Sequence, residues 1–467
     1  MKQGEQINLD EPATPTFGTD EIIHSNGWPL SSQLSPALLG EVDLPGDKSV
    51  SHRALIFGAL AVGETRIDGL LEGDDVLATA RALTAYGVEI ARDSPGRWRV
   101  WGTGIGGFKE PASVLDLGNA GTAARLLMGV ATHYPFATFF TGDTSLRGRP
   151  MKRAMEPLIE MGARVTTRSG CRLPLSLIGS TQLLPITYTM PVASAQVKSA
   201  ILLAGLAAPG KTSVVEPSPS RDHTERMLTH FGAEISVVND AESTRIITLT
   251  GQPELAGQKL SVPADISSAA FPLAAALIVP GSQLLLRNVG VNPLRAGLLD
   301  CVHEMGGEIK LQNARNLSGE PVADIAVVAS PLRGIDVPAD RAPSMIDEYP
   351  VLAILAACAD GQSRLRGLDE LRHKESDRFA SILSGLLAAG VSVSNEGDDI
   401  LINGRGAPPP GGAKIKSHLD HRIAMAFLVL GLACRDGMAI DDGASISTSF
   451  PDFVDLMSSL GARIENV

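Results

Sequence analysis

The sequence contains few cysteines, few aromatic residues and no excess of positive charge. Its four cysteines, at positions 171, 301, 358 and 434, stand far apart and form no C-x-x-C pair. This spacing argues against a zinc knuckle and against a secreted disulfide framework, and it favours a reducing cytoplasm. Aspartate and glutamate total 52 against 40 lysines and arginines, and the formal net charge of −12 argues against a nucleic-acid-binding surface. Any anion site must therefore be local.

Long hydrophobic runs are also missing. The longest, residues 269–280 and 423–434, are shorter than the roughly 18 apolar residues that a transmembrane helix requires, so we expect no membrane segment. Residues 1–37 carry five acids and one lysine, and they match neither a secretory signal nor an arginine-rich transit peptide. We interpret residues 1–37 as a loosely ordered extension.

Aliphatic residues supply the core. Hydrophobic residues make up 44% of the chain and aromatic residues only 4%, which indicates closely packed aliphatic helices and strands of an α/β protein. A chain of 467 residues is too long for one ordinary core, so its length favours two or three domains.

One pattern recurs six times along the chain. In each copy an amphipathic segment ends at a glycine, and a β-branched residue follows three positions later. The six glycines, 70 to 84 residues apart, are Gly87, Gly162, Gly232, Gly306, Gly390 and Gly461. Glycine at this place predicts a helix that stops in the left-handed conformation and a strand that follows it.

A second helix is expected earlier in every copy. These six segments are apolar nearly all round, which is typical of a buried helix. They cover residues 51–61, 120–131, 195–207, 267–278, 349–359 and 422–434. The predicted unit is strand, buried helix, strand, outer helix, strand. Six units could form a linear solenoid, but buried helices between strands favour two compact α/β domains of three units each, with a crossing near residues 257–263.

The starts of the buried helices carry unexpected cations. Lys48, Arg53 and Arg422 lie in first turns, where the positive end of the helix dipole disfavours a cation by about 0.3–1 kcal/mol unless an anion compensates. Backbone N–H groups and cations together form an anion cradle. If these helix starts face one cleft, the expected ligand is small and multiply anionic, because arginine binds phosphate or carboxylate through two parallel hydrogen bonds.

Two outer segments add cations to this prediction. Residues 146–150 place two arginines before a proline, and residues 372–378 place Lys374 and Arg378 four apart on one helix face with Glu375 between them. Taken alone, either segment would be read as an ordinary salt-bridged surface. Together with the helix starts, they favour a binding site.

The motifs at these positions resemble those of a known family. Residues 44–53, 117–122 and 420–422 are similar to the signatures of the enolpyruvylshikimate-phosphate synthases, and residues 194–198, 220–223, 345–350 and 448–451 resemble the bacterial class II branch. The resemblance runs from about residue 40 to the C-terminus. It implies two inside-out α/β domains of three units each. The first would cover residues 48–258, and the second residues 38–47 plus 259–467.

The resemblance also implies substrates and a set of site residues. The substrates would be 3-phosphoshikimate and phosphoenolpyruvate. The expected contacts of 3-phosphoshikimate are Lys48, Ser49, Arg53, Ser194, Ala195, Gln196, Arg221, Asp347 and Lys374. Those of phosphoenolpyruvate are Lys48, Asn119, Gly121, Thr122, Arg149, Gln196, Arg378 and Arg422.

The implied chemistry is transfer of an enolpyruvyl group to the 5-hydroxyl of 3-phosphoshikimate. A base must accept the hydroxyl proton while an acid protonates the methylene carbon, and we assign Asp347 to the first role and Glu375 and Lys48 to the second. No metal or organic cofactor is expected, and we predict a cytoplasmic monomer. Where many class I members carry a lysine, this chain has Thr448, so one phosphate-binding cation is missing there.

Two alternatives remain open at this point. One is the same transfer onto a UDP-sugar, as in the peptidoglycan enolpyruvyltransferase, whose loop cysteine has no counterpart in residues 142–149 of this chain. The other is a non-catalytic repeat scaffold, for which six units alone would suffice. Asp347, Glu375 and the clustered cations argue against the scaffold.

Overall fold

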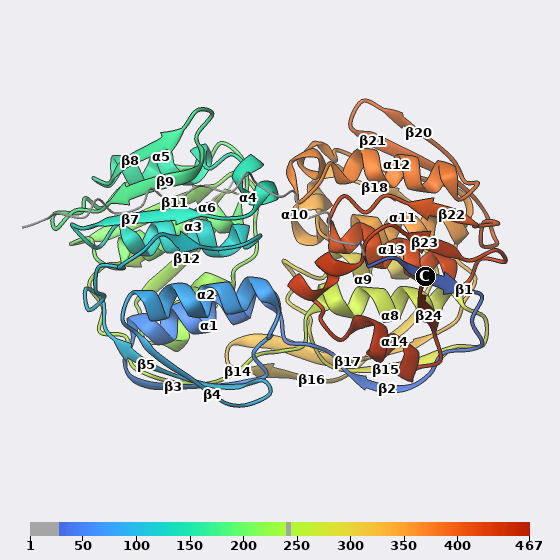
Figure 1. Ribbon diagram of the computed structural model, residues 1–467, viewed down its shortest axis with the longest axis horizontal. Coiled ribbons are helices and arrows are strands. Elements are labelled where there is room, and N and C mark those ends of the chain that lie inside the picture. The colour runs from blue at the N-terminus through green and yellow to red at the C-terminus, as the bar shows by residue number, and fades with distance from the viewer. Residues whose placement is uncertain (1–27, 240–243) are drawn as a thin grey trace, which may run out of the picture.

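The computed structural model describes residues 28–239 and 244–467. Figure 1 shows two lobes side by side, each with helices inside and strands toward the outside. Each lobe has its own hydrophobic core. One core is formed by residues between 50 and 262, and the other by residues 30–42 together with residues between 264 and 464.

Six four-stranded sheets share one topology. In every sheet the first strand is parallel to the second, and the second and fourth are antiparallel to the third. The recurrence of this pairing confirms the six predicted units and the inside-out α/β fold.

The first lobe contains three of these sheets. In spatial order they are β14 (Lys259–Ser261), β3 (Val62–Asp68), β5 (Arg97–Thr103) and β4 (Glu89–Ser94); β6 (Leu115–Asp116), β7 (Ala137–Thr141), β9 (Arg172–Ile178) and β8 (Arg164–Arg168); and β10 (Thr187–Thr189), β11 (Lys211–Glu216), β13 (Arg245–Thr250) and β12 (Ile235–Asn239). Its helices are α1 (Lys48–Leu60), α2 (Asp74–Ala85), α3 (Gly121–Ala131), α4 (Thr144–Gly148), α5 (Lys152–Glu160), α6 (Ala195–Gly205) and α7 (His223–His230).

The second lobe repeats the arrangement. Its sheets are β2 (Leu39–Asp43), β15 (Gln283–Gly290), β17 (Glu320–Val328) and β16 (Glu308–Leu317); β18 (Asp336–Val337), β19 (Asp360–Leu365), β21 (Asp399–Arg405) and β20 (Ser392–Glu396); and β22 (Ala413–Ile415), β23 (Met438–Ile440), β1 (Leu30–Gln33) and β24 (Arg463–Asn466). Its α-helices are α8 (Ile266–Ile278), α9 (Gly297–Glu304), α10 (Ala342–Met345), α11 (Tyr349–Cys358), α12 (Arg378–Ala388), α13 (His421–Gly431) and α14 (Phe453–Ser459). Three 3-10 helices are η1 (Ala339–Arg341), η2 (Asp369–His373) and η3 (Ala444–Thr448).

The six predicted buried helices correspond to α1, α3, α6, α8, α11 and α13 of the structure. Every residue of α8, α11 and α13 is buried, because alanine, leucine and isoleucine occupy all faces of these helices. The outer helices end at the six predicted glycines, whose φ angles lie between 83° and 110°. A side chain with a Cβ rarely adopts this conformation, which explains why glycine stands at each stop.

The N-terminal strands correct one interpretation. Residues 1–37 were expected to form a loosely ordered extension, but β1 is the third strand of the sixth sheet, where Leu30 is fully buried. In Figure 1 the blue arrow of β1 lies among the red elements of the second lobe, and β2 lies at the lower edge of that lobe beside β15. β1 therefore supplies the third strand of the sixth sheet, whose other three strands lie between residues 413 and 466. Residues 1–27 lie outside the described part.

The predicted division between the lobes also shifts slightly. Residues 259–261 were placed in the second domain, but β14 pairs with β3 in the first lobe. The chain therefore crosses after Val262, which still belongs to the first core. At the crossing the two connecting segments run side by side, because Asp47 N donates to Pro263 O at 2.8 Å and Gly46 bridges Ala264.

Candidate active site

The starts of helices from both lobes meet at one place. The backbone N–H of Lys48, at the start of α1, lies 3.3 Å from a carboxylate oxygen of Asp265, which caps α8. Arg221, two residues before α7, forms an ion pair with Asp347, two residues before α11. These contacts bring the starts of α1 and α7 of the first lobe beside the starts of α8 and α11 of the second.

Asp347 lies at the centre of a group of cations. Its carboxylate accepts hydrogen bonds from Arg221 and from Arg378 Nη1, the latter at 3.2 Å, and Lys374 Nζ lies 3.7 Å away. Arg422 Nη1 donates to the main-chain oxygen of Asp347 at 3.2 Å. Burial raises the pKa of Asp347, but Lys374, Arg221, Arg422 and Arg378 together outweigh burial and hold that pKa well below its ordinary value. Asp347 is therefore a carboxylate in this structure.

Glu375 is held by arginines from both lobes. Arg378 donates to one of its oxygens, and Arg149 Nη1 of the first lobe lies 3.9 Å from the other. Burial raises the pKa of Glu375, whereas Arg378 and Arg149 lower it, and the result lies well below the ordinary value. Arg378 itself is fully buried, and its Nε donates to Asp420 at 2.8 Å. Its donors thus point at Asp347, Glu375 and Asp420, so Arg378 fixes both predicted catalytic carboxylates.

Lys48 is paired within its own lobe. Its Nζ lies 3.0 Å from Asp75 Oδ2, and the two side chains are 15% and 10% exposed. Burial raises the pKa of Asp75, and the charge of Lys48 opposes that effect. Asp47 caps α1 by accepting a hydrogen bond from a backbone N–H, which leaves the Lys48 side chain free to reach Asp75. A predicted proton-transfer residue therefore has a carboxylate partner.

The loop before α3 supports Arg149. Asn119 accepts a hydrogen bond from Arg149 Nη2, and the amide group of Asn119 donates to Asp143 at 2.7 Å. Arg149 Nη2 also donates to the Ser145 hydroxyl at 3.1 Å. Gly121 begins α3 beside these groups, and a Cβ at this position would lie 2.9 Å from Arg149 Nη1. The absence of a side chain at Gly121 leaves room for the guanidinium.

The start of α6 presents Gln196 to the same space. Ser194 caps α6 with its hydroxyl, and Ala195 is the first residue of the helix. The Gln196 side chain donates to Thr122 Oγ1 at 2.9 Å and accepts from Arg125 Nη1 at 3.0 Å. These two hydrogen bonds fix the orientation of the predicted substrate-binding amide.

The Arg53 side chain is more deeply buried than expected for a residue that only binds substrate. It is 3% exposed, and it donates to Thr224, Ser199 and the main-chain oxygen of Ser49 at 2.7, 2.7 and 2.9 Å. Burial lowers the pKa of Arg53 to about 10, although nearby acids oppose the shift. Contact between Arg53 and a substrate remains a prediction.

The position of the missing lysine is occupied by neutral groups. Thr448 donates to Ser445 O at 2.7 Å, and its hydroxyl lies 3.4 Å from His421 Nδ1. Burial lowers the pKa of His421 well below its ordinary value, and the charges of Lys48 and Arg422 act in the same direction. His421 therefore does not supply the absent cation.

The sequence prediction missed the acids that balance the positive charge of the candidate site. Asp75, Glu348 and Asp420 are buried beside Lys48, Arg422 and Arg378 respectively. All three stand at helix starts, where aspartate and glutamate are ordinary residues, so only their proximity to cations identifies them. Arg125 was also missed. Burial lowers the pKa of Arg125 to about 10, and no carboxylate of the described residues lies within salt-bridge distance of it.

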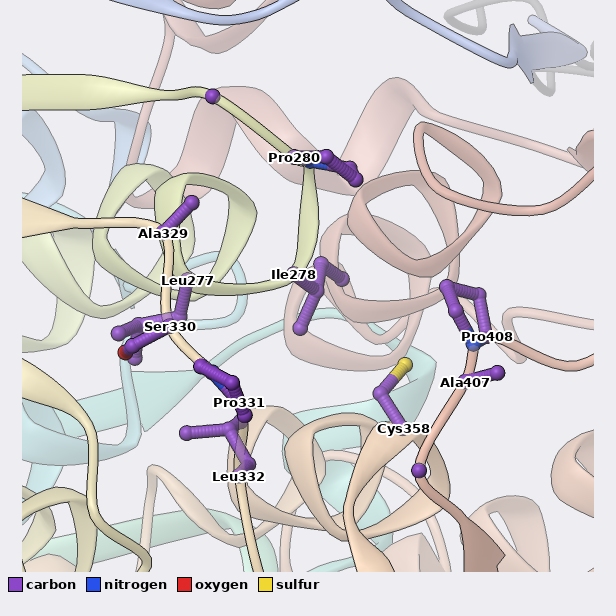
Figure 2. A pocket seen from close by; sticks show the side chains of 12 residues that line it. Leu277, Ile278, Pro280, Ala329, Ser330, Pro331, Leu332, Cys358, Ala407 and Pro408 are labelled. Carbon is purple, nitrogen blue, oxygen red and sulfur yellow. The ribbon is translucent and has the colours of Figure 1, made fainter.

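One pocket lies elsewhere. It has a volume of about 310 Å³ and is lined by Leu277, Ile278, Pro331, Cys358 and Pro408 among others, and Figure 2 shows these side chains. Leu277, Ile278 and Cys358 are at the C-terminal ends of α8 and α11, whereas the charged cluster is at the N-terminal ends. A helix of 13 residues is about 20 Å long, so this apolar pocket is separate from the candidate site.

The described residues contain no candidate metal centre. Within residues 28–239 and 244–467, no group of three or more histidine, cysteine, aspartate or glutamate side chains is arranged to hold a metal ion. In the same residues, every helix is too short or too polar to cross a bilayer.

Comparison with known proteins identifies one family over most of the chain. Residues 33–457 match the family described as EPSP synthase (3-phosphoshikimate 1-carboxyvinyltransferase). A 3-phosphoshikimate 1-carboxyvinyltransferase of Methylorubrum populi is 57% identical over 445 residues, covering 95% of this chain and 98% of that protein. One from Rhodospirillum rubrum is 56% identical over 440 residues, covering 93% and 98%.

Solved structures give the same result at the level of the fold. EPSP synthase from Acinetobacter baumannii has a TM-score of 0.83 and 44% identity, covering 94% of this chain and 99% of that chain. The enolpyruvyl transferase NikO from Streptomyces tendae has a TM-score of 0.75 at 17% identity and equal coverage. At such low identity the likeness to NikO shows the shared architecture alone.

Proposed function

The chain belongs to the EPSP synthase family, and from this membership we infer that it catalyses the reaction of the 3-phosphoshikimate 1-carboxyvinyltransferases. The reaction transfers the enolpyruvyl group of phosphoenolpyruvate to the 5-hydroxyl of 3-phosphoshikimate. The products are 5-enolpyruvylshikimate 3-phosphate and inorganic phosphate, and the reaction is a step of the shikimate pathway to aromatic amino acids. The observation that carries this conclusion is the 57% identity over nearly the full length of the chain, joined to the charged side chains that meet between the two lobes.

For 3-phosphoshikimate we propose a position between α1, α6 and the segment before α11. The supporting observation is that cations and hydroxyl groups from both lobes converge there. The proposed contacts are Lys48, Ser49, Arg53, Ser194, Ala195, Gln196, Arg221, Asp347 and Lys374. Arg221 and Lys374 both pair with Asp347 in the structure, so a phosphate bound by these cations would bring the rest of the substrate close to that carboxylate.

For phosphoenolpyruvate we propose the adjacent space, enclosed by α3, α12 and α13. Lys48, Arg149, Arg378 and Arg422 supply the positive charge, and Asn119, Gly121, Thr122 and Gln196 shape the loop around it. Arg125 is an additional candidate, because its partly buried guanidinium lies beside Gly121 and Gln196. Arginine side chains directed at the carboxylate and the phosphate would stabilise the charge that develops during transfer.

Asp347 is proposed as the base that accepts the proton of the 5-hydroxyl. In the structure the surrounding cations hold its pKa well below the ordinary value, and a carboxylate of that kind is a weak base. Two anionic substrates would neutralise the same cations. Their binding would raise the pKa of Asp347 toward the range in which it accepts a proton.

Glu375 and Lys48 are proposed for proton transfer at the methylene carbon. Glu375 lies between Arg149 of the first lobe and Arg378 of the second. It therefore borders the proposed phosphoenolpyruvate site, where it would transfer a proton to the methylene carbon. Protonation at carbon and attack by the 5-hydroxyl give a tetrahedral intermediate. Loss of phosphate and removal of the methyl proton then restore the enol ether.

We propose that the protein acts as a monomer, because a single chain supplies every residue of the proposed site. We also propose that it works in the cytoplasm, since all four cysteines are free thiols. A UDP-sugar as acceptor is not supported, because residues 142–149 contain no cysteine. A non-catalytic scaffold would not account for the two partly buried carboxylates, Asp347 and Glu375, that are surrounded by cations.

Phosphate release tests the proposed function directly. The purified protein is incubated with phosphoenolpyruvate and 3-phosphoshikimate, and each substrate is omitted in turn. We expect phosphate only when both are present, and no phosphate when a UDP-sugar replaces 3-phosphoshikimate. Phosphate release that does not depend on 3-phosphoshikimate would contradict the assignment.

A further inference from the structure

A buried arginine outside the predicted site, Arg295, lies between the starts of α8 and α11. It belongs to the turn between β15 and α9, and its side chain is 4% exposed. Its Nη1 donates to Glu348 Oε2 at 2.7 Å, and its Nη2 donates to the Ser267 hydroxyl. Burial lowers the pKa of Arg295, but Glu348 and Asp265 raise it, and the outcome is well above the ordinary value. Arg295 is therefore permanently charged.

Glu348 stands between Arg295 and the substrate-binding arginine Arg422. One carboxylate oxygen accepts from Arg295, while the other accepts from Ser267 and lies 3.6 Å from Arg422 Nη1. A separation of 3.6 Å is too long for a hydrogen bond. Arg422 Nη1 donates instead to the main-chain oxygen of Asp347 at 3.2 Å. Arg295 is thus the principal partner of Glu348, and Arg422 is only a distant one.

The Glu348 carboxylate has no capping role that would explain its burial. The neighbouring helix starts are capped by side chains, since Asp265 accepts from Ser267 N and Asp420 accepts from Arg422 N. Glu348 precedes α11 but makes no side-chain cap hydrogen bond. Its side chain is 1% exposed. It accepts hydrogen bonds from Arg295 and the Ser267 hydroxyl, and it lies 3.6 Å from Arg422.

We propose that Arg295 is a positioning residue for Arg422: by occupying Glu348 it prevents a close Glu348–Arg422 ion pair and keeps Arg422 available for phosphoenolpyruvate. The inference rests on the proposed function, in which Arg422 binds that substrate. Without Arg295, Glu348 would be a buried carboxylate that lacks its main partner, which is a strongly unfavourable state. Arg422, already 3.6 Å away, would move to Glu348 and leave the cleft.

Steady-state kinetics of four proteins test the proposal. Arg295→Met should raise the Michaelis constant for phosphoenolpyruvate roughly 5- to 50-fold, a typical coupling between neighbouring groups, and change kcat and the constant for 3-phosphoshikimate by less than about threefold. Adding Glu348→Gln to Arg295→Met should restore the phosphoenolpyruvate constant to within about threefold of wild type, because a neutral amide does not attract Arg422. Arg295→Lys keeps the positive charge but loses the planar guanidinium group. Its Michaelis constant for phosphoenolpyruvate should lie between those of wild type and Arg295→Met.

Arg366→Met is the matched control. Arg366 forms an exposed pair with Asp336 in the same lobe through two hydrogen bonds of 2.6 Å, so its loss should leave both Michaelis constants unchanged. If Arg295→Met does not yield folded protein by circular dichroism, Arg295→Lys with and without Glu348→Gln provides the same comparison.

Several outcomes would overturn the positioning role. They are an unchanged phosphoenolpyruvate constant in the Arg295 variants, an equal rise in both Michaelis constants, and a double variant no better than its parent. A purely structural role for Arg295 would give the last of these, because removing Glu348 as well would not rescue substrate binding. A wild-type protein that releases no phosphate would instead contradict the proposed function. That result is distinguishable from failure of the positioning role, which appears only in the variants.

Discussion

Asp347 is the residue whose surroundings bear most directly on the chemistry. Changing Asp347→Asn keeps the size of the side chain but removes the proposed base, so we expect turnover to fall by roughly 10²–10⁴-fold. The measurement is phosphate release at saturating substrates. Asp336→Asn, which alters an exposed partner of Arg366 in the same lobe, is the control and should retain normal turnover. Near-normal turnover of folded Asp347→Asn protein would rule out the role.

The same carboxylates make stability depend on pH. Burial raises the pKa values of Asp347 and Glu375, but the surrounding cations hold both well below their ordinary values. Their stabilisation is complete above the unfolded-state pKa of about 4 and is lost as the pH falls through the folded-state value. We therefore expect the unfolding temperature of the wild type to fall more steeply below about pH 4 than that of Asp347→Asn. Calorimetry across this range checks the slopes, and parallel curves would contradict the prediction.

Gly121 is expected to set sensitivity to glyphosate, which occupies the phosphoenolpyruvate pocket in members of this family. A Cβ here would lie 2.9 Å from Arg149 Nη1 and 3.0 Å from Arg125 Nη1, the ends of two flexible side chains. Gly121→Ala should therefore fold but displace these guanidinium groups, and we expect glyphosate binding to weaken roughly 5- to 150-fold. The Michaelis constant for phosphoenolpyruvate should change less, because this substrate is more compact.

Inhibition titrations at matched substrate saturation check this expectation. Gly290→Ala in β15 is the matched control, since a Cβ there meets neighbours only at ordinary contact distances of 3.6 Å or more. Equal inhibition constants for wild type and Gly121→Ala would show that Gly121 does not line the pocket.

At the residue scale, the sequence predicted the cations of the cleft better than the acids. Lys48 and Arg422 were recognised because a cation in the first turn of a helix is unfavourable without an anion. Asp75 and Asp420 gave no such signal, since acids are common at helix starts. Their role depends on which cation the fold brings beside them, and a single sequence does not contain that distance.

Among the elements, the six buried helices and their partner glycines were predictable because their signals are local. A largely apolar segment of 11 or 13 residues, such as α3 or α8, and a glycine stop are visible within a short window. Strand β1 was not predictable in this way. It has four residues, two of them serine, and it pairs with β23 and β24 more than 400 positions later. Its place follows only from the incomplete sixth sheet.

Strand β1 provides a test at the element scale. A chain that begins at residue 35 lacks β1 and leaves β23 and β24 without their shared central strand. It also loses the burial of Leu30. We expect such a chain to be insoluble or to unfold at least about 10 °C below the full-length protein, given the usual shift of a few degrees per kcal/mol. A chain that begins at residue 28 keeps every described strand and is the matched control. Equal unfolding temperatures for both shortened chains would contradict this account.

At the scale of the whole molecule, the lobes contact each other on two sides. Near the crossing segments, the turn after β16 reaches the first lobe, where His223 Nδ1 lies 2.8 Å from Glu320 and Arg226 donates to Gly319 O. Across the cleft, Arg153 pairs with Glu370 at 2.8 Å. Contacts beside the crossing can persist during a hinge motion, whereas contacts across the cleft must break when the lobes separate.

Substrate-driven closure is the prediction that follows from this arrangement. The contacts on this side include an exposed ion pair of little energetic value and several pairs that involve proposed substrate-binding residues, such as Arg221 with Asp347. Each substrate would bind cations of both lobes and would therefore stabilise the closed arrangement more than the open one, which is the condition for a ligand to shift the equilibrium. We expect small-angle scattering to show a smaller radius of gyration with both substrates than without them. 3-Phosphoshikimate alone should produce part of the change, because its proposed contacts also come from both lobes. Scattering curves that coincide with and without substrates would mean that the acids of the cleft, in place of the substrates, already hold the lobes together.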